Sequence, residues 1–418
     1  MSTDFEPKSA ALRALKERGF IDAMTDAEAI DDAFDQGMVT FYVGYDPTAS
    51  SLHAGSLTCI MVQRLLQRLG HKPIVLLGGG TAMVGDPTGR TESRQMLTTE
   101  TLAANVAGIR RNFDGFLHFE DGKPNDAVML DNSTWLGALG YLEFLRDIGS
   151  HFTVNRMIAA KTYRDRLQNE QPLSFLEFNY QLLQAYDFLH LRREHACTMQ
   201  LGGSDQWGNM VAGVELIRRL DHVHAQALTW PLLLTADGRK MGKTAEGAIW
   251  LDPEQCPPFD YYQYWVNCHD DDVRNHLLKY TDLPVTEVGE LCKAEGAALR
   301  EVKARLAFEA TALAHGTEAA TAAQEGAKQA FSGAGDWSAV PAVAVGVTTI
   351  GLLDLVVHPD VGAFKSKREA RQRIEAGAVK IDGEPVTDPA FVLEASAYAD
   401  DTARLQAGKK KRFRIVLR

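Results

Sequence analysis

The stretch Gly44-Tyr45-Asp46-Pro47-Thr48-Ala49-Ser50-Ser51-Leu52-His53-Ala54-Gly55-Ser56 is, together with a second motif at 240–244, the most informative feature of the chain. It follows a strand-like run at 38–43 and precedes an amphipathic helical pattern at 57–69, so it predicts a turn from a strand into a helix. The amide groups at the start of such a helix attract phosphate. Thr48 and His53 can add side-chain donors, and Gly55 leaves bare backbone against which a flat adenine can lie.

A second motif, Lys240-Met241-Gly242-Lys243-Thr244, supplies two ammonium groups and a hydroxyl on one short segment. Its last three residues are like the end of a P-loop, but that motif needs a glycine where this chain has Asp237. The residues after Thr244 also do not continue as an apolar helix, which excludes a P-loop. Lysines are most often part of a solvated basic loop, but together with the first stretch these two indicate a nucleotide site.

Three polar residues, Tyr180, Gln184 and Asp187, are spaced so that they share one face of a helix. Such a row is usually exposed to solvent. Here large apolar residues surround it, so the row can instead face a buried pocket. The neighbouring residues are Phe175, Phe178, Leu182, Leu183, Tyr186 and Phe188.

Two further segments are candidates for contacts with a nucleotide. Gly202 to Gln206 follows a strand-like run, and its glycines can be mere turn geometry or can let a ribose approach Asp205. Arg90 and Arg94 lie in a segment rich in glycine and threonine, where arginines are usually ordinary surface residues.

The composition is that of a globular protein. The chain has 418 residues, 45% hydrophobic and 24% charged, which suffices for two or three domains with a large core. No apolar run is long enough to span a membrane, and the N-terminus is unlike a signal peptide. The five cysteines are scattered without any C-x-x-C pair, which predicts reduced thiols and no metal site. We therefore expect a cytoplasmic protein with no membrane partner.

Apolar strand-like runs at 39–43, 73–77 and 198–201 alternate with helical patterns, which predicts an α/β fold with a mostly parallel sheet. We assign this catalytic domain to 1–231 and expect about 113–149 to leave the sheet as an insertion. Residues 232–331 hold the KMGKT segment and then a helical pattern.

The end of the chain differs from the rest in charge. Residues 332–350 are rich in glycine and lack periodicity, so they predict a linker. Residues 351–418 carry 13 Lys or Arg against 10 Asp or Glu, whereas the whole chain has a net charge of −11. The run from Lys409 to Arg412 can be a disordered tail, but the strand-like residues after it favour a folded edge that contacts phosphate. An acidic total charge does not exclude RNA, because binding depends on the local field.

Several segments in a fixed order give the chain its resemblance to a known family. It resembles the class I aminoacyl-tRNA synthetases with HIGH and KMSKS motifs, and among them the bacterial tyrosyl-tRNA synthetases. The similarity extends over essentially the whole chain. The segments that carry it are GYDPTASSLHAGS (44–56), GGGTAMVGDPTGR (78–90), SFLEFNYQLLQAYD (174–187), QLGGSDQWGN (200–209) and KMGKT (240–244).

The resemblance implies a Rossmann-type parallel-sheet catalytic domain, a helical domain and a small α+β RNA-binding domain at 351–418. It implies that L-tyrosine is activated with ATP and then transferred to tRNA(Tyr). Mg²⁺ would come with ATP, because the sequence shows no carboxylate cage, and no cofactor would be bound permanently. A homodimer, with its interface in the 113–149 insertion, is implied by the resemblance alone.

The resemblance also assigns roles to individual residues. Phosphate contacts and catalysis fall to Thr48, His53, Lys240, Lys243, Thr244, Arg90 and Arg94. Tyrosine contacts fall to Tyr42, Asp86, Tyr180, Gln184, Asp187 and Gln206, with Asp187 and Tyr42 on the phenol hydroxyl and Tyr180, Gln184 and Asp86 on the ammonium. ATP contacts fall to Gly44, Asp46, His53, Gly55, Ser56, Gly203, Asp205 and Lys243. RNA contacts fall to Lys365, Lys367, Arg368, Arg371, Lys409, Lys410, Lys411 and Arg412.

One position departs from the family pattern, because Ser56 stands where the family has a second histidine or asparagine. Its hydroxyl can donate one hydrogen bond from a shorter side chain. The nearest alternative enzyme is the tryptophanyl relative, but Asp187 with Tyr42 suits a phenol better than an indole. A non-catalytic RNA-binding or splicing protein on the same scaffold is the alternative from another class. The presence of Thr48, His53 and both motif lysines argues against it.

Overall fold

The computed structural model describes residues 5–88, 97–232, 241, 243–244, 247–332, 337, 340, 342–408 and 411–418. The chain forms two compact units. The first consists of Met1–Lys243, Trp250–Asp252 and His269–Glu295. The second consists of Thr244–Ile249, Pro253–Cys268 and Gly296–Arg418. Among the described residues, none of the helices is long and apolar enough to cross a membrane.

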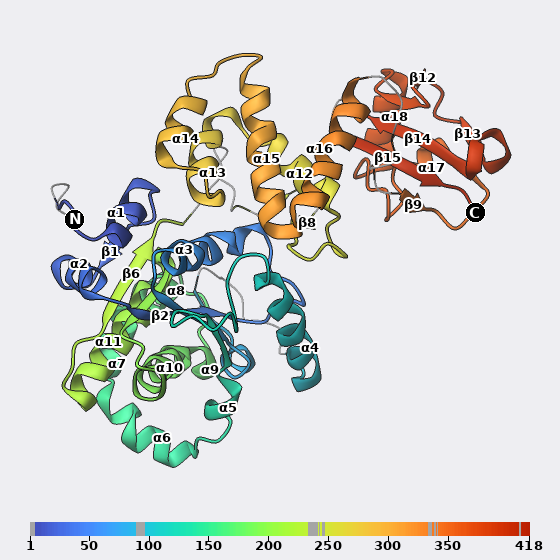
Figure 1. Ribbon diagram of the computed structural model, residues 1–418. Helices are drawn as coiled ribbons and strands as arrows, with labels where there is room; N and C mark the ends of the chain where they lie inside the picture. The colour runs from blue at the N-terminus through green and yellow to red at the C-terminus, as the bar shows by residue number, and fades with distance from the viewer. Residues whose placement is uncertain are drawn as a thin grey trace. The chain divides into compact units, whose positions relative to one another are not determined.

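The first unit is built on a six-stranded sheet with the order β1-β6-β5-β2-β3-β4 (Figure 1). All neighbours are parallel except β1, which runs antiparallel to β6. The strands are β1 (Ala23–Met24), β2 (Thr40–Tyr45), β3 (Lys72–Leu77), β4 (Val128–Asp131), β5 (Met199–Gly203) and β6 (Gln226–Trp230). β2 and β3 are buried along most of their length, as apolar strands of a parallel sheet are. The predicted α/β fold with a parallel sheet is confirmed.

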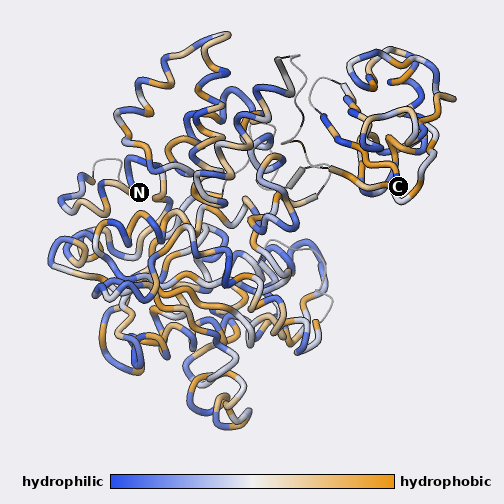
Figure 2. Tube along the Cα trace, turned by 45° about the vertical axis from the view of Figure 1, so that its right-hand side comes forward, coloured by the Kyte–Doolittle hydropathy of each residue, from blue (hydrophilic) through white to orange (hydrophobic). Residues whose placement is uncertain are grey.

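Helices cover both faces of this sheet, with α3 on one side and α10 and α11 on the other (Figure 1). Tyr42 and Ile74 of the sheet pack against Phe188 of α10 and Ile217 of α11 in one buried cluster. Hydrophobic stretches run through the interior of this part of the chain (Figure 2). The helices are α1 (Ala10–Glu17), α2 (Ala27–Gln36), α3 (Leu57–Arg68), α4 (Thr99–Arg110), α5 (Ser133–Leu136), α6 (Tyr141–Asp147), α7 (Val154–Ala159), α8 (Lys161–Gln168), α9 (Phe175–Phe178), α10 (Tyr180–His195), α11 (Trp207–Asp221), α13 (Val273–Tyr280) and α14 (Val285–Leu291).

The strand order creates a crevice beside β2. From β2 the chain passes through α3 to β3 on one side, while β5 lies on the other side of β2. At such a switch point the connections leave in opposite directions, and ligands of α/β proteins bind at the carboxyl ends of the strands there. The turn at 44–56 and the turn after β5 both lie at these ends.

The expected insertion at about 113–149 needs a correction. Residues Val128–Asp131 lie within that range but form β4, which pairs in parallel with β3 from Ile74↔Val128 to Leu77↔Asp131. The run is only four residues long and half-buried, so its apolar pattern is too short to be distinguished from a loop.

The second unit contains the helices α12 (Pro258–Val266), α15 (Leu299–His315) and α16 (Thr317–Ser332), followed by a small α+β part. α12 and α15 carry the buried Trp265, Tyr261 and Leu306, in accord with the aromatic helical pattern of the sequence. A two-stranded sheet joins β7 (Lys243–Thr244) and β8 (Gly247–Ala248).

The C-terminal part holds a five-stranded sheet in the order β12-β11-β14-β15-β9. Its buried residues form a cluster drawn only from residues between Val345 and Leu417, so this part has its own core. The elements are β9 (Ala342–Ala344), β10 (Thr349–Gly351), α17 (Leu352–Leu355), α18 (Lys367–Glu375), β11 (Val379–Ile381), β12 (Glu384–Val386), β13 (Val392–Glu394), β14 (Thr402–Ala407) and β15 (Lys411–Val416). The predicted small α+β fold is confirmed.

The expected linker at 332–350 also needs a correction at its end. Ala342–Ala344 form β9 and pair in parallel with Arg414–Val416 of β15. Thr349 and Ile350, at the end of the same range, begin β10, which pairs with β13. A three-residue strand at the edge of a sheet leaves no periodic pattern in the sequence, so only its pairing partner reveals it.

Candidate active site

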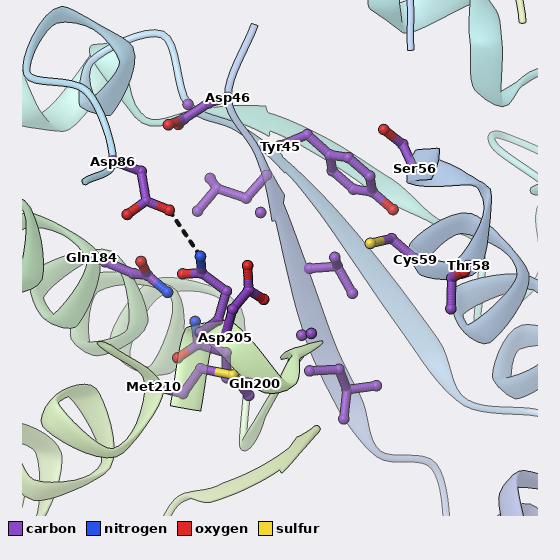
Figure 3. Close-up of a pocket in the computed structure, with 18 of the residues that line it drawn as sticks. Tyr45, Asp46, Ser56, Thr58, Cys59, Asp86, Gln184, Gln200, Asp205 and Met210 are labelled. Carbon is purple, nitrogen blue, oxygen red and sulfur yellow. Dashed lines mark hydrogen bonds between the residues drawn. The ribbon is translucent and has the colours of Figure 1, made fainter. Parts of the chain in front are cut away.

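A cavity of about 470 Å³ lies at the carboxyl ends of β2 and β5. The two glycine-containing turns and the polar row of α10 all contribute to its wall. In Figure 3, Ser56, Thr58 and Cys59 come from the start of α3, and Asp86 and Gln184 lie on the opposite side. The predicted residues that line it are Tyr42, Gly44, Asp46, His53, Gly55, Ser56, Asp86, Tyr180, Gln184, Asp187, Gly203, Asp205 and Gln206.

Asp187 lines this cavity and is 2% exposed. Asn132 Nδ2 donates to its Oδ2 at 2.8 Å, and Trp135 Nε1 donates to its Oδ1 at 2.8 Å. Burial raises the pKa of the Asp187 carboxyl to about 7, although both hydrogen bonds favour its charged form. The two donors fix the carboxylate so that it can still accept a hydrogen bond from a ligand.

Three buried polar atoms on the wall have no partner within the described chain. They are the hydroxyl oxygen of Tyr42, Oε1 of Gln184 and Oε1 of Gln200. Burial, and next the charge of Asp187, raise the pKa of Tyr42 well above its ordinary value, so its hydroxyl stays protonated. A buried polar atom without a partner costs about 1–3 kcal/mol, which a polar ligand would remove.

A second group of carboxylates lies near Tyr180. The Tyr180 hydroxyl donates to Asp46 Oδ2 at 3.0 Å, and Thr81 Oγ1 donates to Asp46 Oδ1 at 2.9 Å. Gln206 Nε2 donates to Asp86 Oδ2 at 2.8 Å (Figure 3). Asp46, which the sequence analysis assigned to ATP, therefore lies beside Tyr180, which it assigned to the ammonium group of the amino acid. Several carboxylates close together favour the binding of a positively charged group of a ligand.

The turn at 44–56 fixes the orientation of His53. Gly55 N donates to His53 Nδ1 at 3.0 Å, so a neutral imidazole carries its proton on Nε2 and can donate from there. A Cβ on Gly55 would lie 2.7 Å from the carbonyl oxygen of Met241, which explains why a glycine is needed. Ser56 lines the cavity and makes no side-chain cap hydrogen bond, whereas Thr48 is exposed and does not line it.

Part of the predicted phosphate clamp lies outside the described residues. These are Arg90, Arg94 and Lys240, and for Lys243 and Thr244 only the backbone is described. Met241 of the same motif is described, lines the cavity and is 5% exposed. Within the described ranges, no His, Cys, Asp or Glu side chains form a group of three or more that could hold a metal ion.

The predicted RNA-binding residues lie on the C-terminal part. Lys365, Lys367, Arg368 and Arg371 are exposed at or near the start of α18, and Lys367 pairs with Asp354. Lys411 Nζ donates to the carbonyls of residues 362 and 363, and Arg412 is partly buried. Both side chains therefore contribute to the packing of the C-terminal part. Lys409 and Lys410 lie outside the described residues.

Sequence reasoning missed Asn132, Trp135, Gln200 and Thr81. Asn132 directly follows β4, and a polar residue at the carboxyl end of a parallel strand is a usable signal once that strand is recognised. Gln200 lies on β5 among apolar neighbours, where a buried amide is unusual. The signal for Asn132 depended on β4, which the sequence did not reveal, whereas Gln200 lies inside the strand-like run predicted at 198–201.

Comparison with known proteins agrees with this geometry. A family model described as "tRNA synthetases class I (W and Y)" matches residues 35–332, and one described as "Tyrosine–tRNA ligase SYY-like C-terminal domain" matches residues 334–415. A tyrosine–tRNA ligase of Zymomonas mobilis is 50% identical, covering 96% of this chain and 97% of its own length. The same enzyme of Novosphingobium aromaticivorans is 49% identical, covering 97% and 98%. A C-terminally truncated mitochondrial tyrosyl-tRNA synthetase of Aspergillus nidulans has a TM-score of 0.69 at 29% identity, covering 78% of this chain and 94% of its own.

The chain therefore belongs to the class I tRNA synthetases of the tryptophan and tyrosine group. Within that group its relatives over nearly the full length are tyrosine–tRNA ligases. Its activity is the ATP-dependent ligation of tyrosine to tRNA.

Proposed function

We propose that the cavity binds L-tyrosine and ATP side by side and joins them into tyrosyl-adenylate, which then acylates the end of tRNA(Tyr). The observation that carries the proposal is the set of unpartnered buried atoms around Asp187. A phenol hydroxyl can donate to Asp187 and accept from Tyr42, so it suits both groups. ATP–pyrophosphate exchange with each standard amino acid tests the proposal.

In this proposal the ammonium group of tyrosine lies among Tyr180, Gln184 and Asp86. The unpartnered Oε1 of Gln184 supports this position, because it can accept a hydrogen bond from an ammonium. The nearby carboxylates of Asp86 and Asp46 favour the positive charge. Gln206, already bonded to Asp86, contacts the carboxyl end of the amino acid.

ATP would occupy the opposite end of the cavity, between Gly203–Gln206 and the 44–56 turn. Asp205 accepts the ribose hydroxyls, and Gly203 lets the ribose approach the backbone. His53, Thr48, Lys240, Lys243 and Thr244 bind the phosphates, with Arg90 and Arg94 as a second clamp. Mg²⁺ accompanies ATP. The predicted Nε2–H of His53 supports its role as a phosphate donor.

The first step requires no protein nucleophile or general base. The carboxylate of tyrosine is already charged at neutral pH and attacks the α-phosphorus of ATP, releasing pyrophosphate. Catalysis then consists of positioning and stabilisation of negative charge on the phosphates. The terminal adenosine of tRNA takes the tyrosyl group in the second step.

His53→Ala should lower the rate of adenylate formation about 100-fold, because it removes a donor that acts mainly on the transition state. The affinity for tyrosine should stay unchanged, since His53 lies at the phosphate end. Single-turnover kinetics and equilibrium binding of tyrosine measure the two effects separately. A variant that loses tyrosine binding but keeps its rate would show that His53 is structural.

We propose that the RNA contacts of the C-terminal part come from the exposed basic residues at the start of α18, with Lys409 to Arg412. Their charge in an otherwise acidic chain supports this role. A cytoplasmic location is supported by five free cysteines, which suit a reducing compartment.

We also propose a homodimer. Large apolar side chains are exposed on four consecutive helices, α6 to α9, and exposed apolar side chains in such number support an interaction surface on this segment. Leu142 is 78% exposed and Phe175 is 69% exposed. The exposed residues are Tyr141, Leu142, Leu145, Val154, Ile158, Leu167, Phe175 and Leu176. This stretch begins in the range that the sequence analysis assigned to the interface and continues beyond it.

The double variant Leu142→Glu and Phe175→Glu should convert the dimer into a monomer, because burying two carboxylates costs several kcal/mol. Sedimentation velocity at micromolar concentration measures the change in mass. Val392→Glu, at an exposed residue of the C-terminal part, is the matched control and should leave the mass unchanged. A double variant that still sediments as a dimer would place the interface elsewhere.

A further inference from the structure

Met241 of the KMGKT motif is held by a residue from a distant helix. Tyr280, the last residue of α13, donates its hydroxyl to Met241 Sδ at 2.9 Å. The same hydroxyl lies 2.8 Å from Oγ1 of Thr58 on α3. Tyr280 is fully buried and Thr58 is 6% exposed, so solvent cannot easily replace either bond.

The hydrogen bonds run in one direction. Because a phenol has one proton and Tyr280 donates it to Met241, Thr58 must donate to the Tyr280 oxygen. Thr58 is the second residue of α3, directly after the turn that carries His53. The chain of bonds therefore links the start of the phosphate-binding helix to the KMGKT motif.

The position of Tyr280 is itself fixed on α3. Two residues later, Asp282 accepts from Arg64 Nη2 at 2.7 Å and also pairs with Arg68 at 2.6 Å. Arg64 Nη1 donates in addition to the carbonyl of Phe116 at 2.7 Å. The end of α13 is thus bound to α3 by ion pairs that are at least partly shielded from solvent.

The other flank of the motif is attached to the same turn. Leu251 N donates to the carbonyl of Leu52 at 2.8 Å, and Asp252 N donates to Ser51 Oγ at 3.1 Å. The backbone of Trp250 pairs with that of His53 in an isolated antiparallel β-bridge. The carbonyl oxygen of Met241 lies so close to Gly55 that a Cβ added there would be 2.7 Å from it. The chain on both sides of 242–249 is therefore anchored within 51–58.

We propose that Tyr280 is a positioning residue for tyrosine activation: through Met241 and Thr58 it fixes the KMGKT motif on the turn that carries His53. The described part of the motif, Met241, is thereby held against the turn that carries His53. Tyr280 itself does not touch substrate in this proposal. The inference rests on the proposed function, because that function assigns Lys240 and Lys243 to the phosphates.

The test removes one partner at a time with the smallest possible change. Tyr280→Phe, Thr58→Val and Met241→Leu each delete one hydrogen-bonding group and keep the apolar volume. Each should lower kcat of ATP–pyrophosphate exchange about 3- to 10-fold, the effect of one hydrogen bond. The dissociation constant of tyrosine, measured without ATP, should not change. The double variant of Tyr280→Phe with Met241→Leu should be no slower than the slower single variant.

Tyr262→Phe is the matched control, because it removes a hydroxyl from a buried tyrosine of α12 that bonds to the Ala304 carbonyl at 3.4 Å and to the side chain of Gln324, neither of which belongs to the KMGKT motif or to 51–58. It should exchange at the rate of the unmodified chain. Normal exchange by Tyr280→Phe would overturn the inference, as would parallel losses of exchange and tyrosine binding. Met241→Leu keeps the test decisive if Tyr280→Phe fails to fold. An unmodified chain that shows no exchange with tyrosine would instead refute the proposed function.

Discussion

Phenylalanine is expected to support ATP–pyrophosphate exchange about 10²- to 10⁴-fold less well than tyrosine, as measured by kcat/KM. Phenylalanine would fill the cavity but leave Asp187 and the Tyr42 hydroxyl without a partner. Each buried group left unpaired costs about 1–3 kcal/mol. Asn132 and Trp135 each donate to one Asp187 oxygen but cannot replace the hydrogen bond of the missing phenol. Equal rates with both amino acids would refute the assignment of this end of the cavity.

Two variants separate the contributions to this discrimination. Tyr42→Phe removes one neutral hydrogen bond and should reduce the preference for tyrosine about 2- to 12-fold. Asp187→Asn removes a charged acceptor and should reduce it about 10- to 150-fold, while exchange with phenylalanine changes little. Measuring kcat/KM for both amino acids in each variant distinguishes a specific contact from general damage to the pocket.

The pH dependence of tyrosine binding gives an independent check on Asp187. Burial raises the pKa of its carboxyl to about 7 in the empty cavity, so it is largely protonated at pH 6 and charged at pH 8. A phenol donates more strongly to the charged form, and binding should therefore strengthen as the pH rises through 7 and then level off. Calorimetry below pH 7 should detect a released proton. Asp187→Asn should show neither the rise nor the release.

The sheet could be predicted because its central strands are apolar on both faces. β2 and β3 read as continuous hydrophobic runs, and the turn after β2 contains the glycine and histidine that a phosphate site uses. β4 and β9 were missed for the opposite reason. Each is an edge strand of three or four residues whose pairing with β3 or β15 is a long-range contact. Local periodicity carries no information about such partners.

The candidate site shows the same division between local and long-range information. Tyr180, Gln184 and Asp187 could be grouped from the sequence because helical spacing places them on one face. The donors to Asp187 could not be predicted, since Asn132 and Trp135 approach it from a different part of the chain. The role of Tyr280 was still harder to predict. Its hydrogen-bond partner Met241 is 39 residues away, and Tyr280 itself lies in none of the motifs found in the sequence.

A truncation that ends at Val340 is expected to keep ATP–pyrophosphate exchange near the full rate and to lose about 10³-fold in tRNA charging at physiological salt. It removes the 13 basic side chains of 351–418 but none of the residues assigned to tyrosine or ATP. The C-terminal core is self-contained, so its removal takes away no buried partner of the parallel sheet. Val340, which packs against Phe259, is retained.

The salt dependence of tRNA binding decides whether the lost charging reflects lost phosphate contacts. Each phosphate neutralised by a lysine or arginine adds close to one unit to the slope of log K against log salt, so the truncated chain should show a flatter slope. The quadruple variant with Ala at Lys365, Lys367, Arg368 and Arg371 keeps the fold, since all four side chains are exposed, and should flatten the slope by up to about 3 to 4 units. Lys380→Ala, on β11 of the same sheet, is a control for a basic residue outside the assigned set. If the truncated chain charges tRNA as well as the full chain with the same salt slope, the RNA contacts come from the first 340 residues.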